Sequence, residues 1–180
     1  MNITSPISEK TARSLTLGET VSLSGDIIIA RDKVHMRAMT TDDGVSERLR
    51  GATVFHCGPI MSDAGGWKVV AAGPTTSSRM NSLAPDFIRK YGVRAIIGKG
   101  GMSEKVSDAM REVGCVYLAA TGGTAVSLAE GLTVQGVDWE DLGMAEALWR
   151  MRADGLGPLI VAMDSKGNSL YENVRRSLKF

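Results

Sequence analysis

The sequence predicts an α/β domain with a mixed sheet, because apolar strand patterns alternate with glycine-rich loops and helical patterns. Apolar runs at residues 67–72, 93–97 and 115–120 are each followed by a loop of small or hydroxyl side chains. These strand-to-helix loops are Gly73-Pro74-Thr75-Thr76, Gly98-Lys99-Gly100-Gly101 and Thr121-Gly122-Gly123-Thr124. Ligands of parallel sheets bind outside the carboxyl ends of the strands, where helix N-termini offer unpaired N–H groups. The loops therefore predict one shared site for a small anion.

The length and composition indicate a single domain over residues 1–180. A hydrophobic content of 43% is ample for a core. No apolar segment approaches the roughly 18–20 residues that span a membrane, and the first residues lack a signal pattern, so we expect a cytoplasmic protein without a membrane partner. A net charge of +1 and an aromatic content of 5% argue against a nucleic-acid surface. Any attraction for anions must be local.

The first half of the chain reads as strands, one helix and a hairpin. Residues 1–16 form a polar lead-in along a sheet edge or a partner, and residues 21–24 and 27–29 are two strand pieces around a bend. A helix follows Ala30, with Val34, Met36, Ala38 and Met39 as packing residues, and residues 41–50 are a loop or a loose helix. A strand at 53–61, interrupted at Gly58-Pro59, pairs through the turn at 63–66 with the strand at 67–72. This hairpin is the reason to expect a mixed sheet.

The second half reads as helices that alternate with strands, including the apolar runs at 93–97 and 115–120. Pro85 divides the helical segment after Arg79, Gly92 ends it, and Ser103 caps the next helix. A short helix at 125–129 precedes a strand at 132–139 and a loop at 139–144. A half-exposed strand at 145–153 and a buried strand at 157–163 follow. The chain then turns at 164–168, makes a short return at 169–171 and ends in a solvated tail with Arg175, Arg176 and Lys179.

The cysteines and histidines are too few to bind a metal cluster. An iron–sulfur cluster needs about three or four thiolates and structural zinc about four ligands, but the chain offers Cys57, Cys115, His35 and His56. Neighbouring His56 and Cys57 point to opposite faces of a strand, which excludes a nucleophile–base pair. We interpret both cysteines as structural and predict no metal site on this chain.

Seven segments together carry a family resemblance over essentially the whole chain. They are residues 30–35 (ARDKVH), 55–60 (FHCGPI), 71–81 (AAGPTTSSRMN), 96–102 (IIGKGGM), 120–125 (ATGGTA), 139–144 (WEDLGM) and 157–171 (GPLIVAMDSKGNSLY). In this order and spacing the chain resembles the beta subunit of two-subunit, iron–sulfur class I fumarate hydratases. It is also similar to the beta subunit of L-tartrate dehydratase and to the C-terminal domain of single-chain class I fumarases.

The resemblance implies a swivelling beta/beta/alpha domain and a hydro-lyase that interconverts fumarate and L-malate. It implies no cofactor bound by this chain, and a [4Fe-4S] cluster held by cysteines of a partner alpha subunit. One iron of that cluster would act as a Lewis acid on a dicarboxylate substrate. An isolated chain would then fold but be inactive. The assembly, a homodimer of this chain or an α2β2 complex, stays open.

The matching motifs also imply roles for individual residues. The cations that grip the substrate carboxylates would be Arg31, Arg79 and Lys99, and Thr75 would be the candidate base, as an alkoxide stabilised by neighbouring cations. Thr76, Gly98 and Gly100 could add hydroxyl or N–H donors. We expect Asp32 and His35 to orient Arg31.

Two alternatives to a fumarase remain. Asn81 and the Gly-Lys-Gly-Gly-Met loop leave the diacid open, with L-tartrate second to fumarate. A non-catalytic module that binds a phosphate or an organic acid is the other reading. In that case Thr75 and Thr76 would only cap a helix, Lys99 would be an exposed turn residue, and Arg31 would pair with a surface acid.

Overall fold

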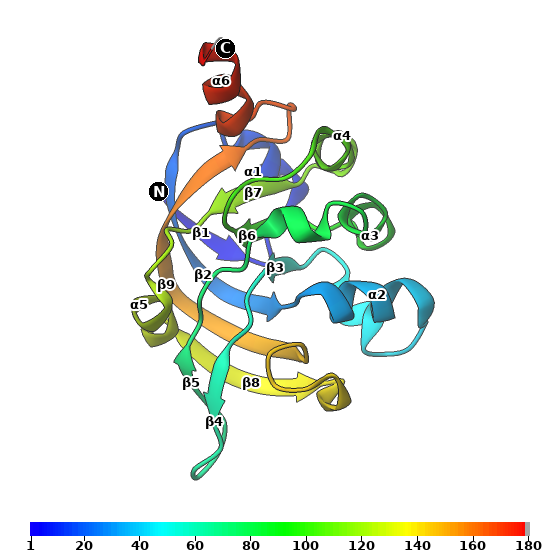
Figure 1. Cartoon of the computed structure of the whole chain (residues 1–180), viewed down its shortest axis with the longest axis vertical. Coiled ribbons are helices and arrows are strands. Elements are labelled where there is room, and N and C mark those ends of the chain that lie inside the picture. The colour runs from blue at the N-terminus through cyan, green and yellow to red at the C-terminus, as the bar shows by residue number, and fades with distance from the viewer. Residues whose placement is uncertain (179–180) are drawn as a thin grey trace.

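The structure, a computed structural model, describes residues 1–178, which form a seven-stranded main sheet, a separate hairpin and six α-helices (Figure 1). The strands of the main sheet are β1 (Asn2–Ser5), β2 (Thr20–Ile29), β3 (Thr53–Phe55), β6 (Ala95–Gly98), β7 (Val116–Ala119), β8 (Leu132–Asp138) and β9 (Leu148–Met163). They lie in the order β1-β2-β3-β6-β7-β9-β8. The hairpin consists of β4 (Ile60–Ser62) and β5 (Lys68–Ala71).

The long strand β9 closes the main sheet on itself. It runs antiparallel to β2 along one side and antiparallel to β7 and β8 along the other. Since β2, β3, β6 and β7 are parallel neighbours, these four strands and β9 form a closed ring. The sheet is therefore mixed, as the sequence predicted.

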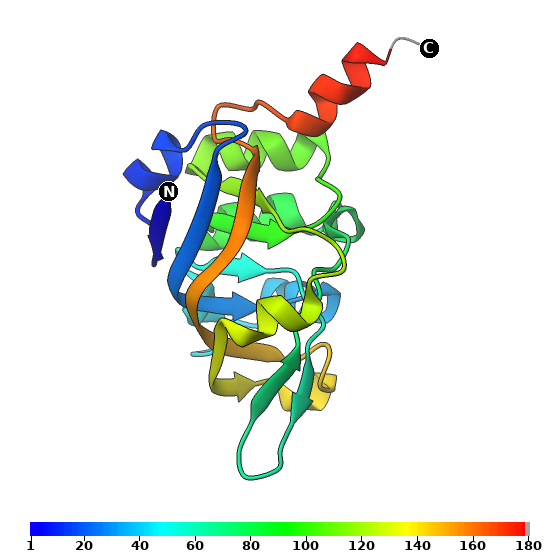
Figure 2. The same ribbon diagram turned by 90° about the vertical axis from the view of Figure 1, so that its left-hand side faces the viewer.

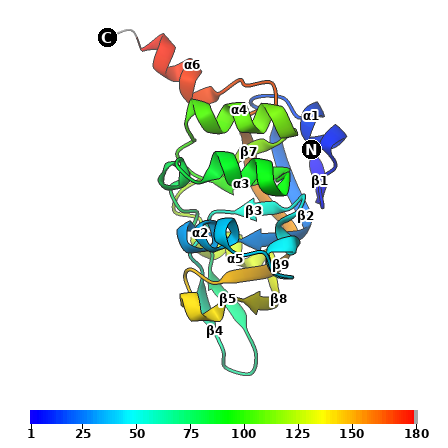
Figure 3. The same ribbon diagram turned by 90° about the vertical axis from the view of Figure 1, so that its right-hand side faces the viewer.

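In residues 1–178, six α-helices pack around this sheet, and both of its faces carry helices. They are α1 (Glu9–Ser14), α2 (Asp32–Thr40), α3 (Ala84–Tyr91), α4 (Glu104–Val113), α5 (Ala125–Glu130) and α6 (Leu170–Ser177), with short 3-10 turns η1 (Ser46–Leu49), η2 (Ser77–Met80) and η3 (Glu140–Leu142). Figure 3 shows α2, α3 and α4 side by side over the same face. None of the helices in residues 1–178 is long and apolar enough to cross a membrane.

Alternation along the strands produces two apolar cores. Strand side chains that face away from α2, α3 and α4 pack together with those of β9; they include Ile29, Phe55, Ile97, Leu118 and Trp149. Their sequence neighbours Ile28, Val54, Ile96 and Tyr117 pack under the three helices. Both strand faces are thus buried, which explains the nearly continuous apolar runs.

Helix boundaries follow the predicted signals. In α3 the buried side chains Ala84, Phe87, Ile88 and Tyr91 recur with helical spacing, which gives the helix one apolar stripe. Gly92 and Gly114 end α3 and α4 in the left-handed region, with φ of 58° and 75°. Ser103 is the N-cap residue of α4 by position, although its side chain makes no capping hydrogen bond.

The prediction of a buried strand at residues 67–72 is wrong. Strand β5 pairs only with β4, in a hairpin that projects from the body of the molecule (Figure 2). Ile60 and Val70 on this hairpin are more than half exposed. The apolar run was therefore misleading, and β9, not the hairpin, makes the main sheet mixed.

Other boundaries also differ from the sequence reading. The pieces at 21–24 and 27–29 are one strand, because register shifts on either side of Leu23 absorb the irregularity without a break. The strands at 145–153 and 157–163 are likewise one, β9. The packing role expected for Met36 is wrong, since its side chain is exposed on α2.

Both chain ends are more structured than the sequence reading proposed. At the amino end, β1 lies at the sheet edge, as predicted, and is followed by α1. The return at 169–171 is the start of α6, where Ser169 Oγ accepts a hydrogen bond from the Glu172 N–H at 3.4 Å. Arg175 and Arg176 lie on this helix, and Lys179 lies outside the described residues.

Substitution of the two helix-ending glycines should lower stability, and we expect a larger loss at Gly114 than at Gly92. Gly92→Ala should lower the free energy of unfolding by about 1 kcal/mol, because alanine disfavours the left-handed region while the space around Gly92 is open. Gly114→Ala should cost more, since its Cβ would come within 2.8 Å of Glu9 Cγ. Denaturant unfolding measures both, with Gly44→Ala as the control in open space without a positive φ. A cost for Gly114→Ala no larger than that for Gly92→Ala would contradict the packing argument.

Candidate functional site

Two loops run side by side at the carboxyl ends of the central strands. The Ser77 N–H donates to the Lys99 carbonyl at 3.0 Å, and the Lys99 N–H donates to the Thr75 carbonyl at 3.3 Å. The Thr75 N–H donates to the His56 carbonyl at 2.7 Å, which ties the first loop to the end of β3. These bonds form a parallel bridge between Thr76 and Lys99. Thr75, Thr76 and Lys99 are thus brought together, and we call this contact the loop crossing.

Glycine at position 98 permits the loop crossing. A Cβ at Gly98 would lie 2.0 Å from Ser77 Oγ, so no larger residue fits unless Ser77 moves. Gly100 has a φ of 82°, which favours glycine, and a Cβ there would lie 3.5 Å from Thr76 Cγ2. The structure therefore explains why glycine occupies positions 98 and 100. The substrate-binding role of Gly98 and Gly100 stays a prediction.

Arg31 and Arg79 meet at a shared carboxylate. Arg31 is the N-cap residue of α2, directly after β2, and its Nη2 lies 3.7 Å from Asp32 Oδ2. The Nη2 of Arg79 lies 3.4 Å from the same oxygen. The guanidinium of Arg31 lies against Gly58, where an added Cβ would come within 2.4 Å of Nη1. Asp32 thus holds the two arginines near each other, in line with the orienting role expected for it.

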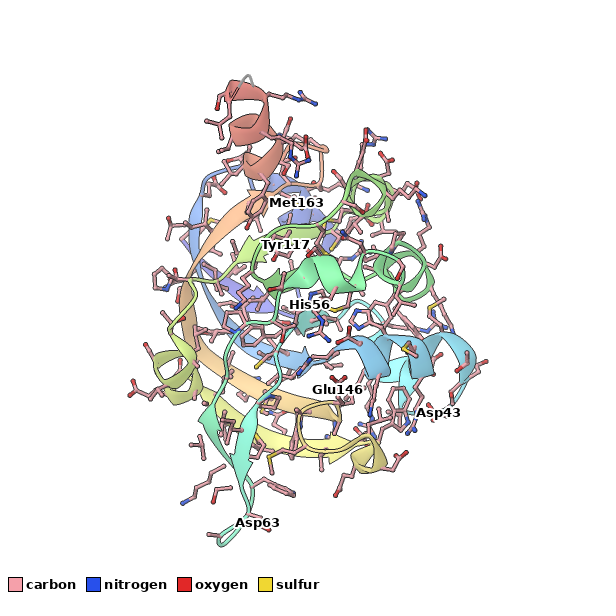
Figure 4. The ribbon with its side chains drawn as sticks, viewed as in Figure 1. Asp43, His56, Asp63, Tyr117, Glu146 and Met163 are labelled. Atoms are coloured by element: carbon pink, nitrogen blue, oxygen red, sulfur yellow. The ribbon has the colours of Figure 1, made fainter. Side chains whose placement is uncertain are left out.

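A second carboxylate, from Glu146, fixes Arg31 from the connection between β8 and β9. Its Oε1 lies 3.3 Å from Arg31 Nη2, and its Oε2 accepts a hydrogen bond from the Lys33 N–H at 3.2 Å. Figure 4 shows Glu146 below His56 in the middle of the molecule, well away from Asp63 at the hairpin tip. Sequence reasoning missed Glu146, since it lies more than a hundred residues from its partners and in no motif.

The two arginines and the loop crossing belong to one site. Arg79 follows Thr75 in the same loop and η2, so the Asp32 contact brings α2 to this loop. Arg31 is mostly buried, with 17% of its side chain exposed, while Arg79 is 54% exposed. Lys99 is exposed and, within residues 1–178, has no carboxylate at ion-pair distance. The site therefore combines two paired arginines with an accessible lysine, an arrangement that suits an anion with two carboxylates.

Both histidines are buried next to the site and neutral at pH 7. His35 Nδ1 lies 2.9 Å from the Arg31 carbonyl oxygen, and His56 Nδ1 lies 2.9 Å from Ser77 Oγ. Burial lowers the pKa of His35 to about 4, although the Arg31 carbonyl and the Asp32 carboxylate favour its charged form. Burial and the neighbouring His35 hold the pKa of His56 well below its usual range. His35 thus contacts the Arg31 backbone, as expected.

Buried polar atoms without a hydrogen bond gather at this site. In the described part of the chain, the buried side-chain nitrogen and oxygen atoms without a hydrogen bond are Arg31 Nε, Asp32 Oδ2, His35 Nε2 and His56 Nε2. Such atoms are rare in folded proteins and usually mark a functional site or a bound water. Their concentration here is independent support for the site.

Neither cysteine is poised for chemistry. Cys57 and Cys115 are buried, and burial raises the pKa of Cys57 to about 12 and that of Cys115 further. Residues 1–178 contain no group of three or more His, Cys, Asp and Glu side chains that could hold a metal ion. These residues therefore do not fit the role of cluster ligands.

The family model for "Fumarase C-terminus" matches residues 1–174. The chain belongs to this family. A putative class I fumarate hydratase from Geobacillus stearothermophilus is 41% identical over 180 residues, which cover 98% of this chain and 34% of that protein. A putative L(+)-tartrate dehydratase subunit beta from Methanocaldococcus jannaschii is 39% identical over 96% of this chain and 91% of its own length. The corresponding Escherichia coli K12 subunit is 35% identical over 93% and 85%. This member of the fumarase C-terminus family thus spans about a third of the first relative and most of the two beta subunits.

The close contact at Gly98 predicts strong coupling between two substitutions. Gly98→Ala should destabilise the protein by about 3 kcal/mol, because its Cβ would overlap Ser77 Oγ. In a Ser77→Ala background the nearest atoms would be Tyr117 Oη at 3.0 Å and the residue 77 Cβ at 3.4 Å, so the added cost should be smaller. A double-mutant cycle by denaturant unfolding should give a coupling above about 1 kcal/mol. Additive losses would contradict the assigned contact.

Burial of His35 predicts a pH-dependent loss of stability. The unfolded chain binds a proton at this residue near pH 6.5, whereas the folded chain does so only near pH 4. Between these values the unfolded state binds more protons, so acidification from pH 7 to pH 5 favours unfolding, by about 2 kcal/mol from this group. His35→Asn, which keeps a donor near Nδ1 but cannot titrate, should remove that part of the pH dependence. Unfolding curves at pH 5 and 7 that shift equally in both proteins would contradict a buried, neutral His35.

Proposed function

We propose that this chain is the beta subunit of a hydro-lyase that reversibly hydrates fumarate to L-malate. Two sets of contacts carry the proposal: Asp32 pairs with both Arg31 and Arg79, and the backbone of Lys99 is hydrogen-bonded to that of Thr75. Membership of the fumarase C-terminus family and the similarity to a putative class I fumarate hydratase support the reaction class. We further propose that the chain forms one domain over residues 1–180, of the swivelling beta/beta/alpha type.

The chemistry of the reaction explains why such a site needs cations. Removal of a proton next to a carboxylate creates a dianionic aci-carboxylate, so catalysis requires groups that bind this charge more tightly than they bind the ground state. We assign this role to Arg31, Arg79 and Lys99. The ion pairs with Asp32 and Glu146 hold Arg31 in place before substrate binds, so little ordering is left for the binding step.

Thr75 is the proposed base. A threonine hydroxyl has too high a pKa to act as a base in water, and it needs an alkoxide-stabilising field in a water-poor site. The backbone contacts that link Thr75 to Lys99 support this assignment, because they keep the residue beside a cation-bearing loop. Thr76, Gly98 and Gly100 would add hydroxyl or N–H donors for the substrate.

The reaction also needs a partner. We propose that a [4Fe-4S] cluster on an alpha subunit supplies the Lewis acid, since the described residues of this chain offer no ligand set for it. The beta-subunit names of two relatives support such a partner. The Geobacillus relative is about three times as long as the matched region, which is consistent with both parts in one chain.

L-tartrate is the second candidate substrate. Two relatives that this chain matches over most of their length are named L(+)-tartrate dehydratase subunit beta. Both candidate acids carry two carboxylates, so the same cations serve either reaction. A non-catalytic anion-binding module is the remaining alternative.

An anaerobic assay with the alpha subunit from the same organism tests the reaction. The mixture should turn over L-malate, whereas either chain alone should be inactive because each lacks half of the site. L-tartrate, offered in parallel, decides between the two substrates. An intact cluster-loaded mixture that turns over neither acid would contradict the catalytic proposal and favour the binding module.

Variants in the same mixture test the residue roles. Thr75→Ala should lower kcat by about 100-fold or more, the usual contribution of a general base, while Thr75→Ser should retain much of the activity. Lys99→Met should raise KM and lower kcat, because it removes an accessible carboxylate-binding cation. Lys10→Met on α1, another exposed lysine, is the matched control and should change neither. Full activity of Thr75→Ala with a small loss of stability would reduce the residue to a structural role.

A further inference from the structure

The buried Ser77 hydroxyl lies between two other buried polar groups. The Tyr117 hydroxyl donates to Ser77 Oγ at 3.0 Å, and Ser77 Oγ lies 2.9 Å from His56 Nδ1. All three side chains are shielded from solvent on the sheet face under α2, α3 and α4, below the loop crossing. Figure 4 shows Tyr117 above His56 along the middle of the molecule. Ser77 therefore connects β7 with the end of β3 through its side chain, while its N–H contacts Lys99.

The donors and acceptors in this group can be ordered in one direction. Burial raises the pKa of Tyr117, so the phenol keeps its proton and donates it to Ser77. Ser77 has one hydroxyl proton, which is then free to be donated to His56 Nδ1. We assign His56 the tautomer that accepts this proton at Nδ1 and carries its own proton on Nε2. This is the opposite tautomer from that of His35, whose Nδ1 must carry the proton, because the Arg31 carbonyl can only accept.

The two histidines are complementary at their remaining nitrogens. Their ring centroids are 5.2 Å apart, and Nε2 of each ring is buried without a partner. In the tautomers assigned above, His56 Nε2 is a donor and His35 Nε2 an acceptor. A hydrogen bond through one buried water, which usually makes two to four hydrogen bonds, would satisfy both nitrogens.

We propose that Tyr117, Ser77, His56 and His35 are positioning residues that form one buried hydrogen-bonded chain from the loop crossing to the Arg31 carbonyl. The chain would position Lys99 and Thr75 at one end and Arg31 at the other. The catalytic importance of these three residues rests on the proposed function. Three links of the chain, Tyr117–Ser77, Ser77–His56 and His35–Arg31, are contacts in the structure. The fourth, between the Nε2 atoms of the two histidines, is part of the proposal. It explains why a serine is buried at position 77 and why Gly98 must leave room for its hydroxyl.

Proton placement on the histidines tests the chain without any assay of activity. The protein has two histidines, so nitrogen NMR of the labelled chain at pH 7 can be assigned with His35→Asn. We expect neutral rings, with the proton on Nε2 in His56 and on Nδ1 in His35. In Ser77→Ala the Nδ1 signal of His56 should shift and that of His35 should not. A charged His56, or one with its proton on Nδ1 at pH 7, would overturn the proposal.

Exchange and kinetics test the positioning role. In Ser77→Ala, hydrogen exchange at the Lys99 amide should be about tenfold faster, the effect of losing roughly one hydrogen bond. Amides within β3 should keep their rates. In the complex with the alpha subunit, the same variant should raise KM for the dicarboxylate about tenfold, and Tyr117→Phe should have a smaller effect in the same direction.

Ser78→Ala is the matched control, because Ser78 is the exposed neighbour of Ser77. It should leave exchange and KM unchanged. If Ser77→Ala behaves like Ser78→Ala in exchange, the positioning role is wrong. If the wild-type complex turns over neither diacid but the exchange result holds, the proposed function fails while the hydrogen-bonded chain stands.

Discussion

The parallel backbone contact between Thr75–Ser77 and Lys99 is the constraint on which the rest of the site depends. It exists because Gly98 has no side chain, so the Ser77 hydroxyl can occupy the space that a Cβ at position 98 would fill. Without it, the loop with Thr75 and Arg79 would be held at the end of β3 but would not be tied to the end of β6. The base of the β4–β5 hairpin and the end of β6 thus form one surface.

Charge balance makes a site rich in cations compatible with folding. Asp32 and Glu146 offset the charges of Arg31 and Arg79, and burial keeps both histidines neutral, so no further positive charge accumulates beside the arginines. Lys99 remains accessible on its loop. A dicarboxylate that enters this site meets oriented donors, which is the arrangement that favours a transition state with more negative charge than the substrate.

The sequence predicted the family and the helix-ending Gly92, because these depend on local backbone chemistry and on motifs. It grouped three loops into one site, and the loop crossing joins two of them, those with Thr75 and Lys99. It did not predict that β9 is one strand closing the sheet, since register shifts leave little trace in an alternating pattern. It placed β5 in the core, because Val69 and Val70 look the same in a projecting hairpin as in a buried strand. It also missed Glu146, Ser77 and Tyr117, whose roles arise from tertiary contacts between distant segments.

The most direct test of the account is a structure of this chain in complex with the alpha subunit, determined anaerobically with succinate, a saturated dicarboxylate that cannot be dehydrated. The account predicts carboxylate oxygens within hydrogen-bond distance of Arg31, Arg79 and Lys99, with the Thr75 hydroxyl facing the carbon chain. A bound dicarboxylate that touches none of these side chains, or that lies on the alpha subunit alone, would contradict it.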